Sequence, residues 1–134
     1  MAKHKEPTST PKQAILAPTQ REEIFRAEYA NNIRLEPTVY DLKVIFGETD
    51  LSSGAEIVKQ HTAITIPWAL VKVGLYLLEV NLEVHEFLNG KVIVPPSQIP
   101  APSGPIPPEH QNDPNAPKVR EIAEKIRQEF LKTL

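Results

Sequence analysis

Hydrophobic and polar residues alternate along three stretches in the first half of the chain. The two outer stretches, residues 24–35 and 57–66, alternate less regularly than the middle one, 40–46. One face of that middle stretch carries Tyr40, Leu42, Val44 and Phe46. Because successive side chains of a strand point to opposite faces, the two-residue period predicts three β-strands. Residues 47–54 have the composition of a loop.

A period close to 3.6 replaces the alternation after Pro67. Proline is well placed at the first position of a helix, and the Asn89-Gly90 pair is typical of a helix end. The pattern therefore predicts a long helix over residues 67–88 and a short final strand over 91–94. The expected fold is α+β: a small antiparallel sheet of order β-β-β-α-β along the chain, with the long helix packed on it.

The predicted long helix has one narrow polar stripe and apolar residues over the rest of its surface. The stripe comprises Lys72, Tyr76, Glu79, Glu83 and Glu86. One apolar row runs from Trp68 to Leu82, and the second comprises Leu70, Val73, Leu77, Val84 and Leu88. A sheet covers only one side of a helix, so we expect the second row to form a homodimer interface. The alternative cover for this row is the N-terminal arm or the C-terminal helix.

The two ends of the chain differ in composition from the middle. Residues 1–20 are polar and aperiodic, which predicts a disordered arm before an α+β core domain over 21–94. Residues 95–117 contain nine of the 14 prolines and predict an extended polyproline linker. Residues 118–134 recover a helical period.

This terminal segment predicts an amphipathic helix. Its apolar stripe comprises Val119, Ile122, Ile126, Phe130 and Leu134. Glu121 and Lys125 are placed four residues apart for an ion pair along the helix. Such a stripe on a long tether indicates a docking helix, whose receiver is the core of its own dimer, a second copy in a coiled coil, or a separate protein partner. An address peptide for a larger assembly such as a protein shell is a specific version of the last case.

Several segments of the core together resemble a known family. They are residues 28–34 (EYANNIR), 41–47 (DLKVIFG) and 61–68 (HTAITIPW), with Asn81-Leu82 and Gly90-Lys91 after them. They are similar to the short prokaryotic proteins grouped as domain of unknown function 3467. The resemblance covers residues 24–94 and implies a β-β-β-α unit of bacterial or archaeal cytoplasmic origin. It implies no activity, cofactor or catalytic residue.

The chemistry-bearing residues form no recognisable catalytic or metal-binding motif. Cysteine is absent, which excludes disulfides, thiolate nucleophiles and cysteine-ligated metals. His61 and His85 are interpreted as ordinary histidines of a strand and a helix. We therefore predict no catalytic residue, metal or cofactor. Asn31, Asn32 and Arg34 form a candidate ligand face, although such a cluster also satisfies backbone groups around a bulge.

Nucleic-acid binding is the alternative function. An exposed sheet face would offer single strands two aromatic rings and three basic groups, from Tyr29, Tyr40, Arg34, Lys43 and Lys59. The net charge of −2 shows no basic footprint over the whole chain, and Tyr40 belongs to the apolar row expected in the core.

The longest apolar run, residues 64–82, is interrupted by Lys72 and Glu79, which predicts a buried helix rather than a membrane span. The N-terminus lacks the apolar region of a secretory signal, so we expect a cytoplasmic protein. The sequence as a whole favours a non-enzymatic, homodimeric interaction or adaptor module that reaches a protein partner through its C-terminal helix.

Overall fold

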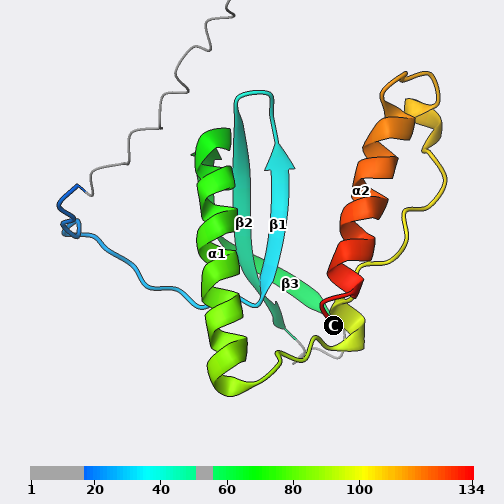
Figure 1. Cartoon of the computed structure of the whole chain (residues 1–134). Coiled ribbons are helices and arrows are strands. Elements are labelled where there is room, and N and C mark those ends of the chain that lie inside the picture. Colours follow the sequence, from blue (N-terminus) through cyan, green and yellow to red (C-terminus); the bar gives the residue numbers. More distant parts are fainter. Residues whose placement is uncertain (1–16, 51–55) are drawn as a thin grey trace, which may run out of the picture. The chain divides into compact units, whose positions relative to one another are not determined.

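The computed structural model describes residues 17–50 and 56–134 (Figure 1). Its elements are the strands β1 (Asn32–Pro37), β2 (Asp41–Asp50) and β3 (Ile57–Pro67), the helices α1 (Trp68–Asn89) and α2 (Ala116–Leu131), and the short 3-10 turns η1 (Pro96–Gln98) and η2 (Pro108–His110). The sheet is antiparallel, and β2 pairs with β1 on one side and with β3 on the other. The predicted α+β class is confirmed.

These elements belong to two compact units. The first unit contains the described residues up to Thr38 and those between Lys43 and Thr65, and so holds most of the sheet. The second contains Val39–Leu42 and Ile66–Leu134, and so holds both helices. Most of the predicted N-terminal arm, residues 1–16, lies outside the described residues, as do residues 51–55 of the predicted loop.

β2 continues past the point at which its composition predicted a loop. Residues 47–50 belong to the strand although they read Gly-Glu-Thr-Asp. Gly47 is buried, and a Cβ placed on it would lie 2.7 Å from the carbonyl oxygen of Lys59. The strand persists because β3 and the backbone and side chain of Asn31 supply hydrogen-bond partners, an effect that local propensity does not contain. Gly47 allows β3 to approach this closely.

β1 is shorter than predicted. It begins at Asn32, whereas the alternation predicted an extended strand from residue 24. Residues 17–30 form no regular secondary structure. The Asn pair therefore marks the beginning of the strand instead of a bulge within it, which agrees with the scarcity of asparagine inside strands.

α1 lies within one residue of its prediction at both ends. Pro67 is the N-cap residue rather than the first helical residue, and it has an extended backbone. Gly90 follows the last turn with φ of 92°, a conformation that favours glycine, and its N–H donates to the carbonyl oxygen of Glu86 at 2.9 Å.

The predicted final strand over residues 91–94 was wrong. This segment has no regular secondary structure, and the N–H of Val92 donates to the side-chain oxygen Oε2 of Glu86 at 2.9 Å. A short apolar run becomes a strand only where a sheet edge accepts its backbone groups. Here the carboxylate of Glu86, near the end of α1, accepts the hydrogen bond from the N–H of Val92 instead.

Hydrophobic side chains are poorly covered throughout the residues described. Leu42 in β2 is the single buried hydrophobic side chain among them, with 7% of its surface exposed. Tyr40 was expected to share this apolar row, but it lies just before β2 and is exposed. α1 contributes no buried residue.

Candidate functional site

The candidate ligand face around Asn31 is tied to the neighbouring strand. The side-chain oxygen of Asn31 accepts the N–H of Thr49 at 2.8 Å, and its own N–H donates to the carbonyl oxygen of Gly47 at 3.0 Å. These two bonds extend the pairing of β1 with β2 beyond the end of β1. Asn32 is half-buried, while the side chain of Arg34 is exposed and has no hydrogen bond or ion pair within residues 17–50 and 56–134. Asn31 therefore has a structural role, and the three residues do not converge on one point through hydrogen bonds.

His61 fastens the segment before β1 to β3. Its Nε2 lies 2.8 Å from the carbonyl oxygen of Tyr29, and its Nδ1 lies 2.7 Å from the hydroxyl oxygen of Thr62. A carbonyl oxygen only accepts, so Nε2 carries the proton and donates it. Both ring nitrogens thus have protein partners. This arrangement fits the ordinary strand histidine predicted from the sequence and leaves neither nitrogen for a ligand or a reacting group.

A hollow of about 670 Å³ lies beside this histidine. Arg26, Glu28 and Ala30 line it from the segment before β1, Phe46 from β2, and residues 61–64 from β3. The imidazole that lines it belongs to His61 and is engaged as described. No group of three or more His, Cys, Asp or Glu residues capable of holding a metal occurs in the described ranges. The residues that line the hollow do not form an evident pair of a general acid and a general base.

The lysines considered for nucleic-acid binding have acidic partners on the same sheet. Lys59 Nζ lies 3.0 Å from a carboxylate oxygen of Asp50, and Lys43 Nζ lies 3.9 Å from one of Glu36. Tyr29 and Tyr40 are exposed. An ion-paired lysine has less positive potential to offer a phosphate, and this weakens the case for binding single strands through the sheet.

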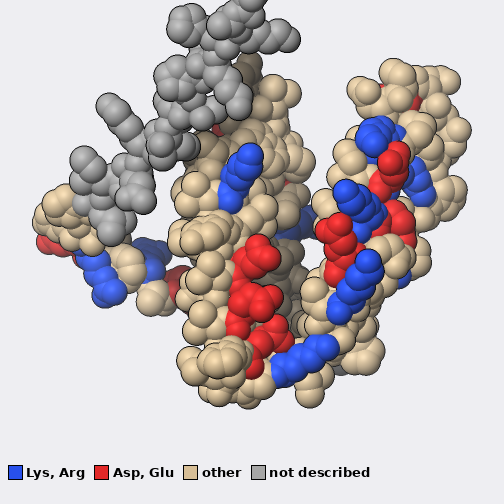
Figure 2. Space-filling view, in the orientation of Figure 1, with Lys and Arg blue, Asp and Glu red and all other residues tan. Residues whose placement is uncertain are grey.

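α1 exposes the whole row of residues that we predicted as a dimer interface. Between 47% and 69% of the surface is exposed for each of Leu70, Val73, Leu77, Val84 and Leu88. The other apolar row is exposed as well, in particular Leu75, Leu78 and Leu82. The three glutamates of the polar stripe form a red column along the helix in Figure 2.

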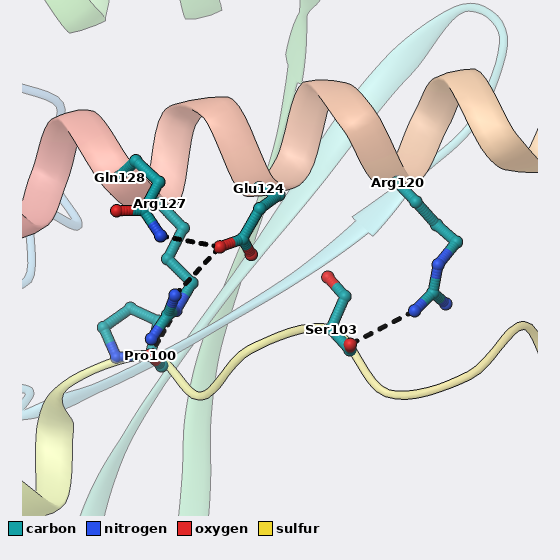
Figure 3. A network of polar contacts seen from close by, with 6 residues as sticks. All are labelled: Pro100, Ser103, Arg120, Glu124, Arg127 and Gln128. Atoms are coloured by element: carbon teal, nitrogen blue, oxygen red, sulfur yellow. Dashed lines mark hydrogen bonds and ion pairs between the residues drawn. The ribbon is translucent and has the colours of Figure 1, made fainter.

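α2 binds the proline-rich segment that precedes it. Arg127 Nε donates to the carbonyl oxygen of Pro100 at 3.0 Å, and Arg120 donates to that of Ser103 at 3.1 Å (Figure 3). Pro95 and Pro107 have polyproline II dihedral angles, and a polyproline chain has no internal hydrogen bonds. Its carbonyl oxygens are therefore open to arginine donors. The sequence shows the two arginines seven residues apart, but their carbonyl partners are not visible in it.

A local network within α2 holds Arg127 in place. The carboxylate oxygen Oε1 of Glu124 accepts hydrogen bonds from Gln128 at 2.8 Å and from Arg127 at 3.0 Å. The hydrogen bond from Gln128, followed by the bond and charge of Arg127, lowers the pKa of Glu124. Glu121 pairs with Lys118 at 3.1 Å, so the predicted ion pair of Glu121 with Lys125 was wrong. The carboxylate of Glu121 pairs with Lys118, one turn before it, and not with Lys125, one turn after it.

The predicted docking stripe stays exposed although the segment is bound to α2. The exposed fractions are 61% for Val119, 48% for Ile122 and 59% for Ile126, while Phe130 is half-buried and Leu134 is 37% exposed. The flank of the helix that carries Arg120 and Arg127 has the half-buried residues Ala116, Arg120, Glu124, Arg127 and Leu131. The segment therefore covers one flank of the helix and leaves Val119, Ile122 and Ile126 of the apolar stripe open.

No family model, curated protein or solved structure matches this chain. The similarity to domain of unknown function 3467 accordingly remains a prediction. Within the described part of the chain, no helix is both long and apolar enough to cross a membrane.

Proposed function

We propose that the protein is a non-enzymatic, cytoplasmic, homodimeric interaction module whose C-terminal helix docks on a protein partner. The observation that carries the proposal is the open stripe of Val119, Ile122 and Ile126 on α2. An isolated helix of 16 residues has marginal stability in water, and three large apolar side chains in line on its exposed face favour association.

The bound proline-rich segment makes α2 better suited to docking. Arg120 and Arg127 anchor that segment on the flank of the helix, which restricts the conformations of α2 before it meets a partner. A binding element that is ordered in advance loses less entropy on association. The row of α1 from Leu70 to Leu88 supplies a second exposed apolar surface, which we assign to the homodimer.

The test compares stripe variants in the full chain. Ile122→Asp with Ile126→Asp places two charges on the stripe, and Gln98→Asp with Asn112→Asp adds the same charge outside α2. Circular dichroism checks folding, and immobilised protein captures partners from the source cells. We expect the stripe variant to lose a specific partner that the control variant retains.

The same set of bound proteins for both variants would contradict the docking role of α2. Loss of the folded state in the stripe variant would also contradict it, because the helix would then belong to the fold. The dimer is tested separately, by light scattering of the wild-type chain.

A further inference from the structure

The edge of the α2 stripe that faces away from the bound segment carries a row of lysines. Lys118, Lys125 and Lys132 follow one another at seven-residue intervals, so they lie along one side of the helix. Lys118 pairs with Glu121. The ammonium groups of Lys125 and Lys132 have no ion pair or hydrogen bond with any described residue. Glu129 lies on the same side of the helix, so the stripe has a basic edge with two unpaired lysines, one glutamate and a net positive charge.

α1 carries the opposite arrangement. Its glutamates Glu79, Glu83 and Glu86 run beside the exposed row of Leu75, Leu78 and Leu82, which gives that apolar row an acidic edge (Figure 2). Glu79 and Glu83 are exposed and have no ion pair among the described residues, while Glu86 accepts the N–H of Val92.

The spacings of the two edges agree. Glu79 and Glu86 are seven residues apart, as are Lys125 and Lys132, which is about 10 Å along each helix at a rise of 1.5 Å per residue. The apolar stripe of α2 has a basic edge and the leucine row of α1 has an acidic edge. The two surfaces are therefore complementary in charge, as the flanking charges of paired helices are in coiled coils.

Pairing of α2 with another α2 is less favourable. Two copies packed through their stripes would bring lysine edges into the same interface, where like charges oppose association. Within one chain, α2 leaves the leucine row of α1 uncovered, since Leu75 is 63% and Leu78 is 70% exposed. A second copy of this chain therefore provides the acidic, apolar receiver.

We propose that α2 of one copy docks on the leucine row of α1 in a second copy, with Lys125 and Lys132 facing the glutamate column. The proposal rests on the proposed docking role of α2 and names its partner. This contact does not use the row from Leu70 to Leu88, which lies on another side of α1 and stays available for the homodimer. Reciprocal exchange of α2 between two chains forms a closed pair without open ends.

The absence of cysteine makes a crosslinking test direct. A full chain with Ile126→Cys and one affinity tag is mixed with a full chain with Leu78→Cys and a second tag, in a glutathione redox buffer. The matched control replaces Leu78→Cys by Val73→Cys, on the other apolar row. Because a disulfide needs Cβ atoms within about 4.5 Å, we expect the Leu78 chain to form the mixed disulfide about tenfold faster.

Charge exchange tests the pairing of the edges. In these cysteine chains, Lys125→Glu with Lys132→Glu, or Glu79→Lys with Glu83→Lys, should each slow crosslinking about tenfold. Combining the reversed α2 with the reversed α1 should restore most of the lost rate, because residues 79 and 83 again face opposite charges. Arg26→Glu with Arg34→Glu is the control for net charge and should have no effect.

Equal crosslinking of Leu78 and Val73 chains, or charge reversal without rescue, would overturn the proposal. So would a disulfide that forms within one chain when Leu78→Cys and Ile126→Cys are combined, since α2 would then dock on its own α1. If the Ile122→Asp/Ile126→Asp variant still loses a partner in these cases, the proposed function stands and only this receiver is wrong. If that variant loses nothing, the docking function itself is wrong.

Discussion

The surroundings of Gly47 and Gly74 show how differently β2 and α1 are packed. A Cβ on Gly47 in β2 would meet the backbone of Lys59 and Gln60 at 2.7 and 3.1 Å, whereas one on Gly74 in α1 would meet nothing within 4 Å. β2 has hydrogen-bonded neighbours on both sides, while α1 has no buried residue. The sheet satisfies its central strand within one chain, but α1 leaves its apolar rows to be covered by something else.

The residues at the two ends of α1 do not stabilise this helix in place of the burial that it lacks. Pro67 makes no side-chain capping bond, the first turn has no acidic residue, and the last turn has no basic residue. Helix ends of this kind gain nothing from capping side chains or from the helix dipole. The stability of α1 must therefore depend on burial of its apolar surface.

The largest expected effect is in the α1 row assigned to the dimer. Leu77→Asp should cost about 3 kcal/mol or more, because the charge would be buried without a partner in the dimer. Light scattering at tens of micromolar should show twice the monomer mass for the wild type and a lower mass for the variant. Glu83→Gln, on the polar stripe, is the control and should leave the dimer intact. If the wild-type chain were monomeric, the claim that a second chain covers the exposed row of α1 would be wrong.

The next largest effect is expected at Gly47. Gly47→Ala should lower the free energy of unfolding by about 1–3 kcal/mol, because the backbone of β3 must move to admit the methyl group. Gly74→Ala is the matched control, where open space and helix propensity predict stabilisation of up to about 1 kcal/mol. Urea unfolding of both variants measures the difference. Equal effects would contradict the difference in packing between β2 and α1.

A smaller effect is expected at the beginning of β1. Asn31→Ala removes the acceptor for the N–H of Thr49 and should cost about 1 kcal/mol. Arg34→Ala removes no hydrogen bond seen in the structure and should stay within about 0.5 kcal/mol. Thermal unfolding distinguishes them. Loss of a bound ligand with an unchanged melting curve would instead restore the candidate ligand face of Asn31, Asn32 and Arg34.

The smallest effect concerns the network on α2. The pKa of Glu124 is lowered mainly by the hydrogen bond from Gln128, so Gln128→Ala should raise it toward its ordinary value. A carboxyl with a depressed folded pKa stabilises the fold above its unfolded pKa, and this contribution is lost as the pH falls through the folded pKa. NMR titration of the Glu124 carboxyl measures the shift. An identical titration in Gln128→Ala would assign the lowered pKa to Arg127 alone.

Local chemistry in the sequence determined the position and type of most elements. The alternation from residue 40 to 46 predicted β2, and Pro67 with Asn89-Gly90 bracketed α1 to within one residue. These signals are local, because a side-chain period, a fixed proline φ and the conformational freedom of glycine act within a few residues. The apolar stripe of α2 was visible for the same reason.

Only the tertiary structure decided where strands continue and what polar side chains bind. Residues 47–50 belong to β2 and residues 91–94 form no strand, since a strand depends on partners that are distant in the sequence. The carbonyl partner of Arg127 lies 27 residues away, at Pro100, and only folding brings the two together. Patterns in the sequence identify surfaces that need covering, and the three-dimensional arrangement determines which of them one chain covers by itself.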